Sequence, residues 1–156
     1  TKTMTKELSF LTNDANETAL LAEKLAKIVK PRDLIFLQGD LGSGKTTYMR
    51  GFLRGLNFTG KVKSPSYTLL EQYDLELTIN HFDLYRFKDQ REWDDAGFNE
   101  FINGNDVNVI EWPEKAVDVI PISDLTIFFR YLDDKKRKIV IEGNSSRGRQ
   151  CIDLLS

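Results

Sequence analysis

The chain has 156 residues, of which 40% are hydrophobic and 29% are charged, and its formal net charge at pH 7 is -2. This balance is typical of a single globular domain spanning residues 1–156, and the slight acidic excess argues against a general nucleic-acid binder. One cysteine excludes an internal disulfide, and no apolar run approaches the roughly 18 residues that cross a bilayer. We therefore expect a cytoplasmic protein without membrane contact.

The N-terminal part of the chain is predicted to alternate between strands and helices. Leu8–Leu11 is typical of a short strand, and Asp14 with Glu17 three residues later is typical of a helix cap. Apolar residues then recur at helical spacing as far as Val29. A proline-containing turn follows, and the apolar run Leu34–Gln38 is typical of a strand buried on both faces.

The rest of the chain is predicted to form one longer helix, from Lys45 to Leu56, and a series of short elements. Further strands are expected at Tyr67–Tyr73, Leu77–Phe82, Val107–Ile110, Leu125–Leu132 and Ile139–Ile141, with short helical segments at Gln90–Ala96, Asn99–Ile102 and Trp112–Val117. This alternation predicts an α/β fold of three layers, with a mostly parallel central sheet and antiparallel hairpin additions.

The most specific pattern is a complete phosphate-binding loop, G-x-x-x-x-G-K-[ST], which lies between the predicted strand and helix. Its residues are Gly39, Asp40, Leu41, Gly42, Ser43, Gly44, Lys45 and Thr46. Backbone N–H groups of such a loop and the following helix N-terminus bind phosphate. Lys45 is expected to reach the β- and γ-phosphates, and the Thr46 hydroxyl to bind Mg²⁺. The strand-loop-helix order predicts a P-loop nucleoside triphosphatase fold.

Two acidic residues end apolar segments and are candidates for handling the metal and the attacking water. Asp83 follows one predicted strand and Glu111 another, and ligands bind at the carboxyl ends of parallel strands. Asp83 is the residue type usual for the metal-binding acid, whereas the Glu111 strand is the more apolar. The sequence alone does not show which of the two acids is closer to the metal. We expect both to lie in the site, one near the metal and the other handling water or supporting the site from outside the metal's direct ligands.

Three further features allow either a functional or a structural interpretation. The hydroxyl-rich loop Ser64–Thr68 suits a γ-phosphate sensor but also an ordinary turn. His81, the only histidine, is more often a packed residue than a general base. Trp112 follows Glu111 and could cover the nucleotide, face a partner or pack in the core.

Four segments in this order resemble the TsaE family, also called YjeE, of bacterial P-loop ATPases. The segments are Gly39–Thr47 (GDLGSGKTT), Ser64–Leu69 (SPSYTL), His81–Arg86 (HFDLYR) and Ile110–Lys115 (IEWPEK). The resemblance covers essentially the whole chain. Small departures occur: Ser43 stands where alanine is usual, and Ser66-Tyr67 where Thr-Phe is usual.

The resemblance implies a Mg²⁺-dependent ATPase that supports threonylcarbamoyladenosine synthesis on tRNA. It implies ATP and ADP as ligands, a TsaB–TsaD transferase pair as partner, indirect contact with tRNA, and weak activity alone. The implied catalytic residues are Lys45, Asp83 and Glu111, and the implied metal ligands are Thr46, Asp83 and Glu111. Besides the loop Gly39–Thr47, the nucleotide-binding residues implied are Leu11, Thr12, Ser66 and Trp112, with the hairpin near Leu132–Arg137 also close to the adenine.

Two other functions remain open at this point. A small-molecule kinase fits the length and the phosphate loop, although no arginine-rich lid segment is evident. A nucleotide-dependent binding module that does not hydrolyse ATP would also use the loop, although Asp83 and Glu111 argue against a pure binder.

Overall fold

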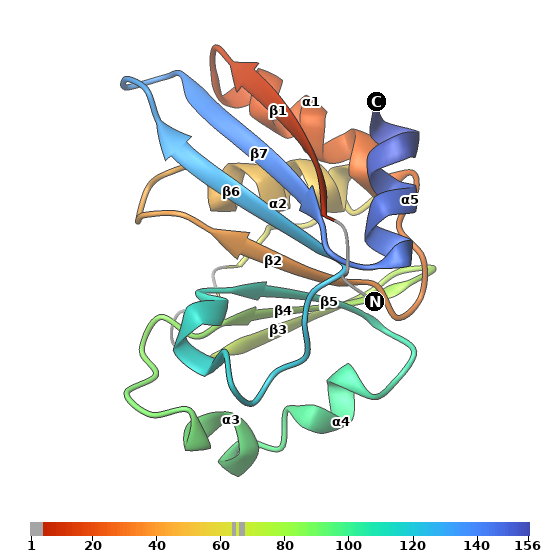
Figure 1. The fold of residues 1–156 in the computed structure, drawn as a ribbon, viewed down its shortest axis with the longest axis vertical. Coiled ribbons are helices and arrows are strands. Elements are labelled where there is room, and N and C mark those ends of the chain that lie inside the picture. The colour runs from red at the N-terminus through yellow and green to blue at the C-terminus, as the bar shows by residue number, and fades with distance from the viewer. Residues whose placement is uncertain (1–4, 64, 66–67) are drawn as a thin grey trace.

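The computed structural model describes residues 5–63, 65 and 68–156, and in these residues seven strands form one mixed sheet with helices on both faces (Figure 1). The strand order is β1-β7-β6-β2-β5-β4-β3. The strands are β1 (Lys6–Thr12), β2 (Leu34–Gln38), β3 (Leu70–Asp74), β4 (Thr78–Asp83), β5 (Val107–Glu111), β6 (Leu125–Tyr131) and β7 (Arg137–Gly143). The helices are α1 (Ala15–Ala26), α2 (Lys45–Gly55), α3 (Arg91–Asp95), α4 (Asn99–Ile102), the 3₁₀ turn η1 (Pro113–Ala116) and α5 (Ser146–Leu155).

The centre of the sheet is parallel and its edges are antiparallel. Strands β6, β2, β5 and β4 pair in parallel, whereas β3 pairs with β4, β7 with β6 and β1 with β7 in antiparallel fashion. This arrangement confirms the predicted fold class. It also brings the carboxyl ends of β2, β4 and β5 to one edge of the sheet, where the phosphate loop follows β2.

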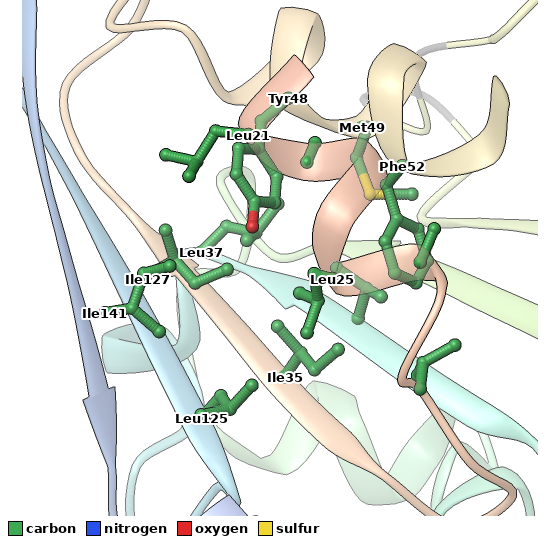
Figure 2. Packing of buried hydrophobic residues seen from close by; sticks show 14 of the residues in the cluster. Leu21, Leu25, Ile35, Leu37, Tyr48, Met49, Phe52, Leu125, Ile127 and Ile141 are labelled. Atoms are coloured by element: carbon green, nitrogen blue, oxygen red, sulfur yellow. The ribbon is translucent and has the colours of Figure 1, made fainter. Parts of the chain in front are cut away.

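Two apolar cores lie on opposite faces of the sheet, as expected for a three-layer domain. Helices α1, α2 and α5 cover one face, and α3, α4 and η1 the other (Figure 1). Figure 2 shows the first core, in which Tyr48, Met49 and Phe52 of α2 lie near Leu21 and Leu25 of α1. Burying a side chain of this size contributes about 1.5–3 kcal/mol, so this core fixes α2 and the loop before it.

The start of α1 is set by a capping side chain, and its distance from α2 is set by a close backbone contact. The Asp14 side chain accepts a hydrogen bond from the Glu17 N–H at 2.9 Å, which caps α1 as predicted. Helix α2 lies so close to α1 that a Cβ added to Gly51 would stand 2.3 Å from the Ala19 carbonyl oxygen. Glycine at this position therefore sets the distance between the two helices.

Most bounds shift by one to three residues from the sequence-based expectation, and two of the departures concern β3 and α5. Strand β3 begins at Leu70 rather than Tyr67, because Leu69 has a φ of 67° and its N–H bonds the Pro65 carbonyl in a turn. Helix α5 was not predicted. Its sequence carried a signal nonetheless, since the Ser145 hydroxyl caps the helix by accepting from the Gly148 N–H at 2.9 Å.

Helix α5 is held to the rest of the domain by a charged pair. The Arg147 guanidinium donates to both carboxylate oxygens of Asp33, at 2.9 and 3.0 Å, and to the Ile28 carbonyl.

Among the helices of the described residues, none is both long enough and apolar enough to cross a membrane.

Candidate functional site

The loop Gly39–Gly44 links β2 to α2 and has the backbone of a phosphate cradle. Gly42 and Gly44 have φ values of 76° and 113°, in the left-handed region that favours glycine. A Cβ on Gly39 would lie 2.8 Å from the Phe129 carbonyl oxygen of β6, so glycine also lets the loop pass close to the sheet. The strand-loop-helix order predicted from the motif is confirmed.

Lys45, the first residue of α2, lies at the centre of a small group of contacts. Its ammonium donates to the Gly39 carbonyl at 2.7 Å and lies 4.0 Å from the centroid of the Trp112 ring. It also lies 3.9 Å from Glu111 Oε1. Burial lowers the pKa of Lys45, while the charges of Glu111 and Asp83 act in the opposite direction. A bound polyanion would favour the charged form further.

The two candidate acids lie side by side at the ends of neighbouring parallel strands. Asp83 and Glu111 are register partners in the β4–β5 pair, and Glu111 is also the partner of Leu37 in β2. Both acids are about 6% exposed, and the Tyr85 N–H donates to Asp83 Oδ1 at 2.9 Å. The sheet therefore brings together the three residues predicted to be catalytic.

Trp112 reaches the site through an unusual backbone turn. Its φ and ψ of 58° and 47° are left-handed, and the residue links the end of β5 to the start of η1. The ring lies over the Lys45 ammonium and packs against Tyr85, with the centroids 4.9 Å apart. Such a conformation costs a non-glycine residue of order 1–2 kcal/mol, which surrounding contacts must offset.

These groups surround a cavity of about 240 Å³ at the carboxyl edge of the sheet. Its lining consists of Leu41, Gly42, Gly44, Lys45, Thr46, Thr47, Asp83, Glu111, Trp112 and Arg137. A second hollow of about 130 Å³ shares Gly44, Thr47 and Arg137 with it and extends toward Ala15 and Thr18 of α1. The combined space suits an elongated ligand with one anionic end.

Arg137 makes contacts to the loop that the sequence did not predict. Its guanidinium donates to the Ser43 carbonyl at 3.0 Å and to the Gly42 carbonyl at 3.4 Å. It also donates to the carbonyls of Asp133 and Lys136 in its own hairpin. The resemblance had placed the hairpin near Leu132–Arg137 close to the adenine, but no local signal in the sequence distinguished Arg137 from its charged neighbours.

Several predicted nucleotide-binding residues lie beside the cavity rather than in its lining. Gly39, Asp40 and Ser43 form the loop itself, and the buried Ser43 hydroxyl has no hydrogen-bond partner among the described residues. Leu11 and Thr12 line a separate hollow, with Leu11 69% exposed and the Thr12 hydroxyl 2.7 Å from that of Thr18. Ser64, Ser66 and Tyr67 lie outside the described residues.

The chain matches the family model described as "Threonylcarbamoyl adenosine biosynthesis protein TsaE" over residues 12–139. The chain belongs to the TsaE family. It is 40% identical over 124 residues to the tRNA threonylcarbamoyladenosine biosynthesis protein TsaE of Haemophilus influenzae, covering 79% of this chain and 78% of that one.

Relatives and a solved structure extend the similarity over nearly the full length. The TsaE protein of Bacillus subtilis is 35% identical over 152 residues, covering 97% of this chain and 95% of that protein. The crystal structure of Bacillus subtilis YdiB superposes with a TM-score of 0.84 at 32% identity, covering 99% and 97% of the two chains. The four-segment resemblance and the fold class are thus confirmed, and TsaE proteins act in tRNA threonylcarbamoyladenosine biosynthesis.

Proposed function

We propose that the chain binds ATP with Mg²⁺ at the loop Gly39–Thr46 and hydrolyses it in support of tRNA threonylcarbamoyladenosine formation by a TsaB–TsaD pair. The observation that carries this proposal is the convergence of Lys45, Asp83 and Glu111 on one cavity beside the loop. A phosphate cradle alone would support binding only. Two buried acids beside the cradle add the groups that hydrolysis requires.

The phosphates would lie between the loop and Lys45. Backbone N–H groups of Gly42–Thr46 would bind phosphate oxygens, and the α2 N-terminus would add partial positive charge. Lys45 would exchange its bond to the Gly39 carbonyl for a phosphate oxygen. Because the Trp112 ring covers the ammonium, little water would compete for that charge.

The donor set of the cavity fits Mg²⁺. Thr46, Asp83 and Glu111 offer hard oxygen ligands, and in the described part of the chain no cluster of three or more His, Cys, Asp or Glu could hold a metal by itself. Magnesium suits such a site because it usually keeps several waters and binds one or two carboxylates together with substrate phosphates. When bound, it would neutralise charge that develops on the phosphates.

The two acids would divide the work. We assign Asp83 to the metal, as the residue type usual there, and Glu111 to the orientation of the attacking water, because Glu111 Oε1 is the oxygen near Lys45. Thr47 and Arg137 would flank the ribose and base in the second hollow. Leu11, Thr12 and Ser66 stay predicted nucleotide neighbours.

Product analysis separates this function from a small-molecule kinase. The protein is incubated with γ-labelled ATP, Mg²⁺ and a metabolite extract, and labelled products are separated. Label in inorganic phosphate is expected, and its loss in Lys45→Ala is the control. Label transferred to an acceptor would overturn the assignment.

A second experiment separates hydrolysis from nucleotide-dependent binding. Glu111→Gln removes one carboxylate charge while keeping the shape of the side chain, so ATP binding should persist and turnover should fall. Formation of threonylcarbamoyladenosine on tRNA is then measured with TsaB and TsaD over many cycles. Wild-type yields with this variant would favour a non-enzymatic binding module.

A further inference from the structure

His81 lies directly beneath the two acids. It is on β4, two residues before Asp83, and its register partner Val109 lies two residues before Glu111 on β5. Because side chains alternate along strands, these residues all face the same side of the sheet. The His81 side chain is 3% exposed and does not line the 240 Å³ cavity, so it has no direct access to a nucleotide.

The imidazole contacts the candidate catalytic glutamate. His81 Nε2 lies 2.6 Å from Glu111 Oε2, a short hydrogen bond. An ionised carboxylate only accepts, so Nε2 must carry the proton. His81 Nδ1 is buried without a hydrogen-bond partner in the described residues. This favours the same tautomer, since an unpaired buried lone pair is tolerated better than an unpaired buried N–H.

This contact divides the tasks of the two carboxylate oxygens. Oε2 is held by His81, which leaves Oε1 as the oxygen that faces Lys45, at 3.9 Å. Glutamate has three side-chain torsions, and a fixed Oε2 restricts the last of them. Without the imidazole, Glu111 could turn and pair more closely with Lys45, which would withdraw Lys45 from the phosphates and Glu111 from the attacking water.

We propose that His81 is a positioning residue that fixes the Glu111 carboxylate for action through Oε1. The inference rests on the proposed ATP hydrolysis, in which Glu111 orients water. It concerns the hydrogen bond rather than any change of charge on the imidazole. An error of about 1 Å in the placement of a reacting group can lower a rate by about 100-fold, which makes such a support consequential.

The contact itself can be tested without measuring activity. Because the chain has one histidine, a long-range ¹H–¹⁵N spectrum reports a single imidazole. The protonated Nε2 tautomer is expected, with a Nε2 resonance that shifts in Glu111→Gln and stays in place in Glu76→Gln, a change of an exposed glutamate. A protonated Nδ1 tautomer, or a spectrum unchanged by Glu111→Gln, would overturn the inference.

The consequence for catalysis is tested by a double-mutant cycle. His81→Leu should lower kcat for ATP hydrolysis by about 10- to 100-fold with little change in KM, and His81→Gln, which keeps a donor, should recover part of the loss. In a Glu111→Gln background, His81→Leu should have little further effect. Equal losses in both backgrounds, with both variants folded by thermal melting, would show that His81 does not act through Glu111.

The two proposals fail in different ways. If the wild-type protein releases no phosphate with or without TsaB–TsaD, the proposed function fails, and the spectrum still decides whether His81 holds Glu111. If hydrolysis is present and the cycle shows independent effects, only the positioning role is lost.

Discussion

The left-handed backbone of Trp112 places its ring against Lys45, the residue expected to bind phosphate. Its left-handed φ of 58° brings the ring over the ammonium, at 4.0 Å from the centroid. A cation held over an indole in a partly desolvated site contributes up to about 2 kcal/mol. The residue therefore offsets the cost of its backbone by covering the charge that is expected to meet phosphate.

Because Trp112 has a left-handed backbone, we predict that replacing it with glycine destabilises the protein less than replacing it with alanine, the reverse of the usual order in a helix. Trp112→Gly should be about 0.5–1 kcal/mol more stable than Trp112→Ala, because glycine adopts a positive φ without the Cβ clash. Urea unfolding measures the difference. At Lys24, an exposed position of α1, the same pair should show the ordinary order, with alanine more stable by about 1 kcal/mol. Alanine more stable than glycine at 112 would contradict the strained turn.

Cys151, on α5, should be a slowly reacting thiol. The residue is 1% exposed, and burial raises the pKa of its thiol, with Arg147 acting in the opposite direction. A raised pKa leaves less thiolate at any given pH, so at pH 8 the native protein should react with a disulfide reagent at least about tenfold more slowly than the urea-unfolded chain. The native rate should keep rising above pH 9, and equal native and unfolded rates would contradict this burial.

At the scale of elements, the spacing of α1 and α2 predicts the effect of one added methyl group. Gly51→Ala improves helix propensity by about 1 kcal/mol, but its Cβ would meet backbone atoms of Ala19, the nearest at 2.3 Å. Overpacking of this kind costs about 1–3 kcal/mol, and backbone neighbours move less readily than side chains. The difference is a net loss of up to about 2 kcal/mol in the free energy of unfolding, and because the neighbours are backbone atoms we expect the upper half of that range.

Gly104→Ala, in the turn that follows α4, is the control for the close contact of the added Cβ. The nearest atoms to its added Cβ lie 3.5 Å away, which is ordinary contact. Urea unfolding should therefore give a change within about 0.5 kcal/mol. If Gly51→Ala were as harmless, α1 and α2 would not approach each other as closely as the structure has them.

The elements most visible in the sequence were those with strong local signals. The buried strand Leu34–Gln38 and the helix α4 (Asn99–Ile102) have the predicted bounds. The start of β3 was wrong because a positive φ at Leu69 is a tertiary feature that composition does not report. Helix α5 was missed because its polar residues mask the few apolar ones that face the core, Cys151 and Ile152 among them.

At the scale of the whole molecule, the site depends on strand order, which sequence motifs do not specify. Lys45, Asp83 and Glu111 were each predicted from local context, and their convergence follows from β5 lying between β2 and β4. The contacts of Arg137 and His81 were beyond prediction, since each joins segments far apart in the chain. Local sequence patterns therefore identified the three candidate residues, and the order of the strands brings them together at one cavity.

The most direct test of the central claim is the rate of phosphate release from ATP across a titration with TsaB and TsaD. We predict a low rate for the protein alone and a rate that rises with both partners. We also predict loss of that rise in Lys45→Ala and in Glu111→Gln. Arg50→Ala, which changes an exposed residue on the same helix as Lys45, should keep the rise. A rate that stays unchanged across the titration, or one that Glu111→Gln leaves intact, would contradict the account.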